Sequence, residues 1–240
     1  MQALVTGATS GIGRAIALAL HGAGHQVVAL GRQKDALAEL KALGIDARCT
    51  DLADRASLAA ALDGLAPDAL VNNAGMVAAP GNFCDMAEAD IHRLVAINLT
   101  QALLVTHAIA PGMRARGLGH IFFTGSVAAY APYPNMAVYA ATKAALGAFA
   151  QSLRLDLSPA GVRVTEIVAG RVESPLYKDV LTAEARAAMY AGQTAVQPED
   201  VAAMVLAVLN LPEHVDVARF DILPTRQPVT PQVPAAEKSK

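Results

Sequence analysis

The chain has 240 residues, of which 54% are hydrophobic and 17% charged, and its formal net charge at pH 7 is −2. An average globular chain is ~25% charged, so this composition excludes a chain that is disordered throughout. The balanced charge, without a basic block, argues against nucleic acid as a partner. The length is within the range of one α/β domain, which commonly reaches ~250 residues.

Cysteine usage and apolar runs indicate where the protein works. Cys49 and Cys84 lie far apart and belong to no paired motif, which excludes a disulfide framework and a zinc ribbon and favours a reducing compartment. The longest apolar stretch, residues 201–209, is shorter than the ~20 residues that span a bilayer. The N-terminus shows no charged region followed by an apolar run, as a secretory signal would. We therefore expect a cytoplasmic protein without a membrane partner.

Short apolar runs alternate with longer segments of helical periodicity along the chain. We expect strands at residues 2–6, 26–30, 46–50, 69–72, 120–124, 162–168 and 219–223. Helices are predicted between them, at residues 11–22, 34–43, 55–62, 88–116, 138–157 and 199–209. Short, wholly apolar strands that alternate with helices indicate a parallel sheet covered on both faces. Right-handed crossovers then predict a three-layer, doubly wound, Rossmann-like α/β fold.

The chain shows neither an internal repeat nor a linker long enough to separate two domains, so we expect a single domain over residues 1–223. Residues 224–240 carry four prolines and a charged end, and they are expected to form an irregular or partly disordered tail. The one long insertion between a strand and a helix covers residues 171–198. Any lid over a substrate should fall there.

The first predicted strand runs into a glycine-rich turn, TGATSGIG at residues 6–13. Gly7 allows a sharp turn, Gly11 leaves space for a pyrophosphate, and Gly13 lets the following helix pack close to the strand. The helix N-terminus offers unpaired N–H groups and the positive end of its dipole to phosphates. Such a turn can also be a tight connection without a ligand, but its place between the first strand and the first helix favours dinucleotide binding.

The end of the second predicted strand indicates which dinucleotide is bound. In NAD-binding folds an acidic residue about 20 residues beyond the glycine turn binds the ribose 2′-hydroxyl. Here the strand is followed by GRQK at residues 31–34, and no acid appears before Asp35. Gly31 leaves room, and Arg32 is a forked, permanently charged donor suited to a 2′-phosphate. We therefore expect NADP(H) over NAD(H); the alternative is an Arg32 that points to solvent and leaves the two cofactors equivalent.

Three further residues suggest proton transfer. Tyr139 and Lys143 are four apart in a predicted helix and so share one face. An ammonium beside a phenol stabilises the phenolate and lowers its pKa. Taken alone, such a pair is more often a surface contact. Ser126, however, lies at the carboxyl end of the fifth predicted strand, where ligand crevices open in these sheets, and a hydroxyl there can polarise a carbonyl.

The sequence resembles the short-chain dehydrogenase/reductase family, in its compact one-domain branch. The resemblance covers nearly all of residues 1–223 and rests on the motifs above together with Asp51-Leu52, the NNAG segment at residues 72–75 and Asn98, in the family's order. It implies that a nicotinamide cofactor is bound by Gly7, Thr9, Ser10, Gly11, Ile12, Gly13, Arg32, Asp51, Leu52, Asn73, Ala74, Gly75, Tyr139, Lys143, Gly170, Val172 and Ser174.

The resemblance also implies four catalytic roles. Tyr139 would be the acid/base, and Ser126 would polarise the substrate carbonyl. Lys143 would bind the nicotinamide ribose and tune Tyr139, while Asn98 would hold a water in a proton relay. The implied activity is NADP(H)-dependent hydride transfer between the nicotinamide and a carbonyl or alcohol substrate.

Two departures from the family pattern concern the loop at the nicotinamide and the C-terminal segment. The usual Pro-Gly after the sixth strand is Ala169-Gly170 here, and Ser174 replaces a threonine, which leaves the stiffness of this loop open. The C-terminal segment lacks a glycine-rich "DGG" and ends PTRQ at residues 224–227. That ending resembles the subgroup acting on 3-hydroxy acids, serine and small aldehydes or ketones.

Alternatives remain open at this point. One is a catalytically idle NADP-binding regulator on the same fold. Another is a 3-oxoacyl-carrier-protein reductase, which would need a basic patch at the mouth of the site. The six histidines are accompanied by no Cys or carboxylate cluster, so we expect no metal. Tyr130 and Tyr133 could line a pocket or pack in a loop, and Arg171 or Lys178 could bind a carboxylate or be solvated.

The predicted helix at residues 138–157 carries more small residues than one buried face needs: Ala140, Ala141, Ala144, Ala145, Gly147 and Ala148. Small side chains allow close approach of another helix. The resemblance implies a homotetramer, or a dimer, built on this helix and the one at residues 88–116.

Overall fold

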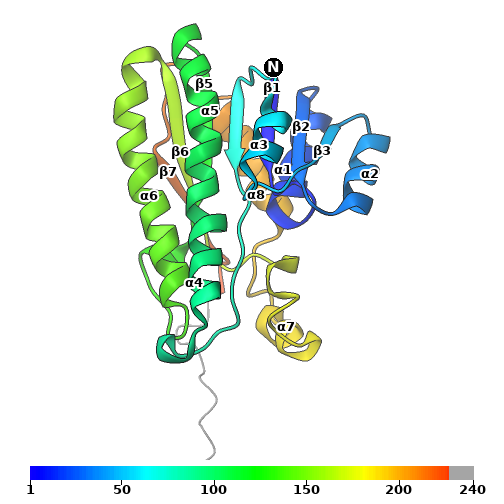
Figure 1. Cartoon of the computed structure of the whole chain (residues 1–240), viewed down its shortest axis with the longest axis vertical. Coiled ribbons are helices and arrows are strands. Elements are labelled where there is room, and N and C mark those ends of the chain that lie inside the picture. Colours follow the sequence, from blue (N-terminus) through cyan, green and yellow to red (C-terminus); the bar gives the residue numbers. More distant parts are fainter. Residues whose placement is uncertain (227–240) are drawn as a thin grey trace, which may run out of the picture.

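A computed structural model of the chain describes residues 1–226 and shows one sheet of seven parallel strands with helices on both faces (Figure 1). The strands are β1 (Gln2–Thr6), β2 (Gln26–Gly31), β3 (Asp46–Cys49), β4 (Ala69–Asn72), β5 (Gly119–Thr124), β6 (Val162–Ala169) and β7 (Arg219–Ile222). The helices are α1 (Gly11–Gly22), α2 (Lys34–Ala42), α3 (Arg55–Leu62), α4 (Glu88–Val95), α5 (Gln101–Arg116), α6 (Ala137–Leu157), α7 (Ala183–Tyr190) and α8 (Pro198–Leu209).

The strand order is β3-β2-β1-β4-β5-β6-β7, so the direction in which the chain winds reverses between β1 and β4. At such a reversal the flanking helices diverge, and a crevice opens beyond the carboxyl ends of the strands. This is the doubly wound, three-layer α/β fold that the alternation of apolar runs predicted. The central strands are apolar at successive positions because both of their faces are covered.

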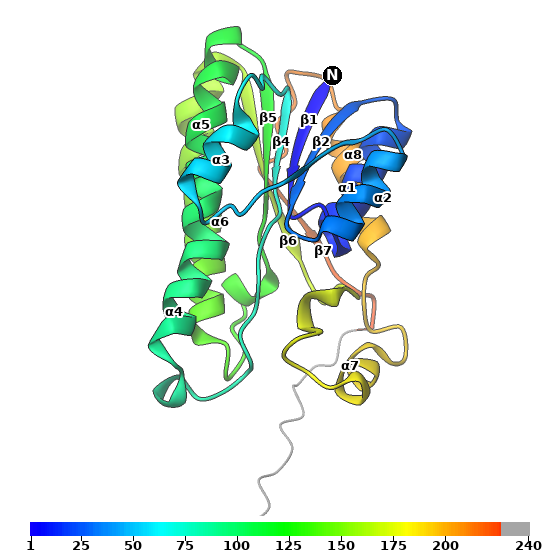
Figure 2. The same ribbon diagram turned by 45° about the vertical axis from the view of Figure 1, so that its right-hand side comes forward.

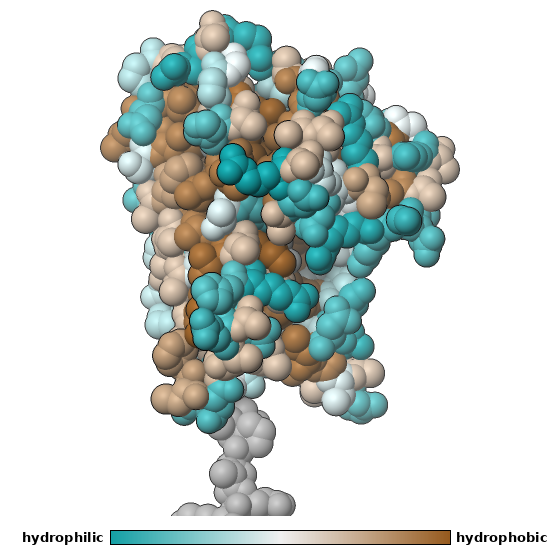
Figure 3. Space-filling view, in the orientation of Figure 1, coloured by the Kyte–Doolittle hydropathy of each residue, from teal (hydrophilic) through white to brown (hydrophobic). Residues whose placement is uncertain are grey.

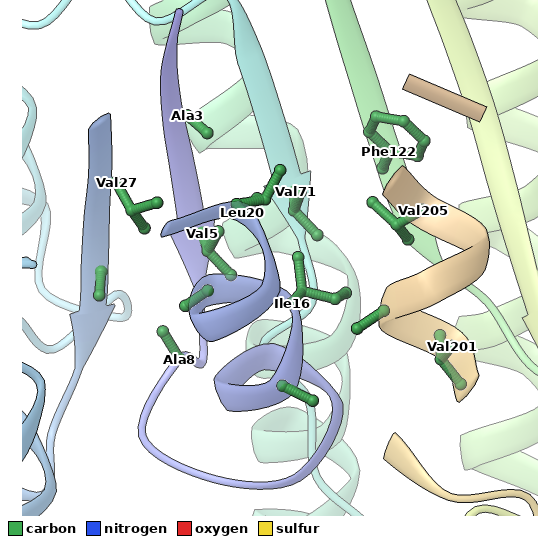
Figure 4. Close-up of a cluster of buried hydrophobic side chains, with 14 of the residues drawn as sticks. Ala3, Val5, Ala8, Ile16, Leu20, Val27, Val71, Phe122, Val201 and Val205 are labelled. Carbon is green, nitrogen blue, oxygen red and sulfur yellow. The ribbon is translucent and has the colours of Figure 1, made fainter. Parts of the chain in front are cut away.

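Alternate side chains of the central strands, β1, β2, β4, β5 and β6, enter two separate cores. On one face, α1, α2 and α8 cover the sheet; Figure 4 shows Leu20 of α1 beside Val5 and Val205 of α8 beside Phe122. On the other face, Leu4, Leu70 and Phe123 point toward α3, α5 and α6. Figure 2 shows these two helical layers on opposite sides of the sheet. Burying both faces of every central strand fixes the strand ends relative to one another, and these ends carry the site.

Two helical segments differ from the prediction. The helix predicted at residues 88–116 is continuous, but the turn that joins α4 to α5, Ala96–Thr100, is π-helical. Helix α7 lies inside the predicted lid and was not predicted. None of its residues is buried, so its sequence carries no periodic apolar face, although Thr182 caps its N-terminus by accepting a hydrogen bond from the Ala185 N–H.

The segment Glu88–Arg116 is long and apolar enough to cross a membrane, with a mean hydropathy of 1.5 over its most apolar window, of which 44% is buried within the protein. Ala102, Val105 and Ile109 of this helix pack in the second core. Packing against the sheet therefore accounts for its apolar character. Of the predicted tail, residues 227–240 lie outside the described part of the chain.

Candidate active site

The carboxyl ends of the strands open into a cavity of about 850 Å³. Residues that follow six of the seven strands, β1 to β6, line it, together with α4 and the segment that contains α7. In Figure 2 this end of the sheet faces down, toward α7. All predicted site residues line the cavity except Gly13 and Asn98, which are buried behind it.

The glycine turn has the geometry that a phosphate needs. Gly7 and Gly11 have positive φ angles of 65° and 52°, which favour glycine. A Cβ at Gly7 would lie 2.8 Å from the Ala74 Cα, and one at Gly13 would lie 2.4 Å from the Gly7 carbonyl oxygen. The side chain of Ser10 makes no capping hydrogen bond, so it leaves the N–H groups of the first turn of α1 to a ligand. The turn therefore fits the diphosphate of a dinucleotide.

The segment after β4 holds the glycine turn in place. The Thr6 hydroxyl accepts hydrogen bonds from the N–H groups of Asn73 and Ala74, at 3.0 and 3.1 Å. The Asn73 amide donates to the Thr6 carbonyl at 3.2 Å and accepts from the Thr124 hydroxyl at 3.3 Å. Gln101 donates to the Ala74 carbonyl at 3.2 Å, a contact that sequence reasoning missed because it depends on α5 lying beside β4.

The ends of β2 and β3 form the far end of the cavity. A Cβ at Gly31 would lie 2.3 Å from the Thr9 methyl, so Thr9 fills the space that the sequence suggested was open for a cofactor. Arg32 lines the cavity and is exposed, and its guanidinium has no partner within residues 1–226. Asp51 and Leu52 line the same end. An unpaired guanidinium at this position is available to an anionic group.

The loop after β6 closes over the glycine turn. A Cβ at Gly11 would lie 3.1 Å from the Ser174 Cβ, so these two segments are in contact. Gly170 donates its N–H to the Ile222 carbonyl at 2.9 Å, and a Cβ there would lie 2.8 Å from the Leu223 side chain. Val172 pairs with Val196 in an isolated bridge that joins the two ends of the predicted lid. The loop is therefore anchored to β7 and α8 without the usual proline.

The structure brings Ser126, Tyr139 and Lys143 together where the cavity meets β5 and α6. Ser126 follows β5 and accepts a hydrogen bond from the Ala128 N–H at 3.1 Å, which orients its hydroxyl. Lys143 is 4% exposed; its ammonium donates to the Thr124 carbonyl at 2.7 Å and lies 5.8 Å from the centre of the Tyr139 ring. The predicted helical spacing thus places the phenol and the ammonium on the cavity side of α6.

Burial moves the pKa values of this pair in opposite directions. Burial raises the pKa of Tyr139, and a hydrogen bond with Ser126 partly opposes the rise. Burial lowers the pKa of Lys143 to about 8, while Glu166 acts to raise it. Burial therefore makes the phenol less acidic and the ammonium more acidic than the same groups in water, because it disfavours the charged form of each.

Asn98 lies in the π-helical turn and is 1% exposed. Its side-chain oxygen accepts from the Met76 N–H at 2.8 Å, and its amide donates to the Met76 carbonyl at 3.0 Å and to the Thr142 hydroxyl at 3.3 Å. Both polar atoms of Asn98 therefore bind protein. Thr142, which sequence reasoning missed, immediately precedes Lys143, and its hydroxyl joins this turn to α6.

The remaining wall is largely apolar and lies on the substrate side of the cavity. Met76, Met136, Leu176, Tyr177 and Met189 all line it. Burial raises the pKa of Tyr177, and Tyr139 nearby adds to the rise, which places the two phenols close together.

The two loop tyrosines that the sequence left ambiguous have different positions. Tyr133 lines the cavity. Tyr130 does not: its hydroxyl donates to the buried Glu166 carboxylate at 2.7 Å.

Two basic side chains lie on the substrate side. Arg171 donates to the Met189 carbonyl at 2.8 Å and forms no ion pair within the described residues. Lys178 also lines the cavity. As for metals, residues 1–226 contain no group of three or more His, Cys, Asp or Glu side chains that could hold an ion.

Comparison with known proteins places this site in a family. The family model for short chain dehydrogenase matches residues 1–185. An uncharacterised short-chain type dehydrogenase/reductase of Sinorhizobium fredii is 45% identical, with 95% of this chain and 92% of the relative covered. Sulfoacetaldehyde reductase 2 of Chromohalobacter salexigens is 37% identical (93% and 94% covered), and the NADP-dependent 3-hydroxy acid dehydrogenase YdfG of Escherichia coli is 35% identical (95% and 96% covered).

Among solved structures, the closed form of a serine dehydrogenase complexed with NADP⁺ superposes with a TM-score of 0.91 at 34% identity, covering 97% of this chain and 99% of that one. The match thus extends over the sheet, the glycine turn and the loop that closes on it. With this likeness and the family match over residues 1–185, the chain belongs to the short-chain dehydrogenase/reductase family, a family of oxidoreductases.

Proposed function

We propose that the protein is an NADP(H)-dependent oxidoreductase that interconverts a small carbonyl compound and its alcohol. The observation that carries this proposal is the cavity with a glycine turn and Arg32 at one end and Ser126, Tyr139 and Lys143 at the other. A nucleotide-binding regulator would need only the first of these ends. The assembled second end therefore favours an enzyme.

The protein's residues bind and polarise the substrate and move its proton. A bound NADP(H) would supply or accept the hydride. In reduction, the Ser126 hydroxyl donates to the substrate carbonyl oxygen and stabilises the charge that develops there. Tyr139 then gives its proton to that oxygen. The Lys143 ammonium stabilises the phenolate left behind, because an opposite charge nearby favours the charged form.

Asn98 acts in this proposal as the clamp that holds the segment after β4 against α6. Its side chain is already engaged by Met76 and Thr142. A relay water at this turn would therefore bind to its backbone, not to the Asn98 amide.

NADP(H) is supported by the unpaired guanidinium of Arg32 and by the relatives. The serine dehydrogenase structure contains NADP⁺, and the Escherichia coli relative is named as NADP-dependent. A 2′-phosphate would bind Arg32 through paired N–H donors.

The substrate is inferred to be a small molecule with an acidic group. The relatives are named after sulfoacetaldehyde, 3-hydroxy acids and serine, and each of these compounds carries an acidic group. Arg171 has no acidic partner within the described residues and lies beside Tyr177 at the substrate side. Arg171→Gln should raise KM for an acidic aldehyde at least tenfold, the effect of losing a charged hydrogen bond of about 1.4 kcal/mol or more. A neutral aldehyde of the same length is the control, and its KM should not change.

The proposal also covers the cellular compartment and the oligomeric state. We infer a cytoplasmic enzyme from its cysteine usage, with both thiols free and exposed. We infer a homotetramer, or a dimer, from the outer face of α5 and α6, where Leu104 and Leu155 are 38% and 64% exposed. Figure 3 shows apolar surface along this side of the molecule, whereas hydrophilic residues are more frequent around α2.

The activity is tested by following NADPH consumption with a panel of aldehydes, ketones and keto acids, using wild type and Tyr139→Phe. Phenylalanine keeps the ring and removes the acidic proton. We expect turnover to fall ~10²–10⁴-fold, the contribution of a positioned acid, with NADPH binding and thermal stability retained. A Tyr139→Phe enzyme with wild-type kcat on a good substrate would refute the mechanism.

A further inference from the structure

A buried carboxylate, that of Glu166 on β6, lies behind the site and has no role in the reaction described above. Glu166 is 1% exposed. Its Oε2 accepts a hydrogen bond of 2.7 Å from the Tyr130 hydroxyl, whereas its Oε1 is buried without a hydrogen-bond partner in residues 1–226. A buried carboxylate that is only half satisfied is unfavourable unless a positive charge compensates it.

Two glycines make room for the unpaired oxygen. A Cβ at Gly125 would lie 2.6 Å from the Glu166 Oε1, and one at Gly147 would lie 2.7 Å from it. Gly125 immediately precedes Ser126, and Gly147 is one helical turn after Lys143 on α6. The unpaired oxygen is thus enclosed by the two segments that carry the polarising hydroxyl and the ammonium.

Four titratable or charged groups face Glu166: Lys143 from α6, Tyr130 from the loop after β5, and Arg219 and Asp221 from β7. We call these four residues and Glu166 the Glu166 cluster. The charges of Arg219 and Asp221 compensate each other at the surface, since the two side chains form an ion pair of 2.9 Å and are 44% and 38% exposed. Arg219 also stacks over the Tyr130 ring at 4.7 Å.

Lys143 is the buried positive charge of the Glu166 cluster. It is 4% exposed and forms no ion pair within the part of the chain described. Its one hydrogen-bond acceptor is the neutral carbonyl of Thr124. Burial favours the uncharged amine, and the negative charge of Glu166 opposes this effect, raising the pKa of Lys143.

We propose that Glu166 is a positioning residue of the reaction: its buried carboxylate keeps the Lys143 ammonium protonated beside Tyr139. The proposal rests on the function proposed above. The carboxylate acts through space, without an ion pair, because the low dielectric of the interior extends the reach of a charge. Burial raises the pKa of the Glu166 carboxyl, and the Tyr130 hydrogen bond opposes only part of this rise. In the alkaline range, where the Lys143 proton is lost, the carboxyl is ionised with or without that hydrogen bond. Gly125 and Gly147 are then required by the carboxylate that they accommodate.

The test is the pH dependence of kcat for carbonyl reduction at saturating NADPH. Activity falls on the alkaline side as the Tyr139–Lys143 pair loses its proton. Glu166→Gln keeps the shape and can still accept from Tyr130, but it removes the charge. In the pH profile of kcat, the alkaline limb of Glu166→Gln should lie about 0.5–1 pH unit below that of wild type, because the ammonium loses its proton more easily without the negative charge. Tyr130→Phe is the matched control, because it removes the hydrogen bond and keeps the charge; its limb should stay at the wild-type position.

An alkaline limb that coincides in Glu166→Gln and wild type overturns the proposal, whatever the change in kcat, because a purely structural carboxylate would lower activity without moving the limb. Glu166→Leu is the second neutral variant if the amide prevents folding, since leucine also removes the charge and needs no hydrogen-bond partner. The same shift is expected, and an unmoved limb again overturns the proposal. A wild-type enzyme inactive with NADPH on every carbonyl would instead refute the proposed function.

Discussion

The burial of Lys143 conflicts with its proposed role as an ammonium. Its side chain is 4% exposed, and burial lowers its pKa from 10.5 to about 8. The unfolded chain therefore binds this proton more tightly than the folded protein between these two pH values. Where the unfolded state holds more protons, stability rises with pH. Lys143 thus costs stability below pH 8, and that cost is removed as the pH rises toward 10.5.

We expect this cost to appear in the pH dependence of unfolding. Between pH 8 and pH 10 the free energy of unfolding of wild type should rise by about 2 kcal/mol relative to Lys143→Met, because methionine does not titrate. Urea denaturation of both proteins at the two pH values measures the difference. Lys178→Met, which removes an exposed lysine, should behave like wild type. Equal pH slopes in wild type and Lys143→Met would mean that the ammonium is not destabilised by burial.

We expect the choice of cofactor to depend on a second single residue, Arg32. Arg32→Ala should raise KM for NADPH by about tenfold or more while leaving KM for NADH nearly unchanged, because only NADPH carries the 2′-phosphate that the guanidinium would bind. Steady-state kinetics with both cofactors measures this. Arg55→Ala, which removes an exposed arginine that does not line the cavity, is the control. Equal kcat/KM for NADH and NADPH in wild type would contradict the assignment.

At the scale of elements, β5 and β6 hold a buried imidazole between them. His120 of β5 hydrogen-bonds through Nε2 to the Thr165 hydroxyl of β6 at 2.8 Å and stacks on Phe122. Burial, helped by the charge of Arg163, lowers the pKa of His120 from 6.5 to about 3. The unfolded chain gains this proton first as the pH falls. His120 therefore lowers the free energy of unfolding progressively from about pH 6.5 down to pH 3.

Replacing this imidazole should make the protein less sensitive to acid. Between pH 7 and pH 5 wild type should lose about 2 kcal/mol more unfolding free energy than His120→Gln, which cannot take up a proton. Chemical denaturation at the two pH values tests this. His214→Gln, in an exposed loop, should keep the wild-type pH dependence. The prediction is wrong if His120→Gln loses as much stability as wild type.

At the scale of the whole molecule, the outer face of α5 and α6 is not explained by the folded monomer. Ala141, Ala144 and Ala148 of α6 are exposed, whereas Ala140 and Gly147 face inward. Small exposed side chains allow another helix to approach, and the exposed Leu104 and Leu155 would add apolar contact area.

We expect light scattering at micromolar concentration to give a mass of two or four times the 24.7 kDa of one chain. Leu155→Glu should lower that mass by placing a charge in the contact, with the fold retained by circular dichroism. Leu43→Glu, at the similarly exposed end of α2, is the control and should leave the mass unchanged. A monomeric wild type would contradict the assembly proposed for this face.

Local sequence was sufficient for the strands and most helices, because short apolar runs and 3.6-residue periods reflect burial directly. The strand from residue 69 and the helix from residue 55 begin and end as predicted. The family is confirmed, and so is the oxidoreductase class. Helix α7 escaped prediction because none of its residues is buried. The domain boundary and the individual site roles stay predictions.

The residues of the site could be named from sequence because their relative positions depend on local structure. The glycines lie within one turn, and Tyr139 and Lys143 lie one helical turn apart on the same helix. Their surroundings depended on segments that meet only in the folded chain. Thr9 occupies the space beside Gly31, Asn98 clamps Met76, and Glu166 fits against Gly125 and Gly147 from a strand far along the chain. Contacts between distant segments leave no periodic pattern in a sequence, so only the tertiary structure decided which charge faces Lys143.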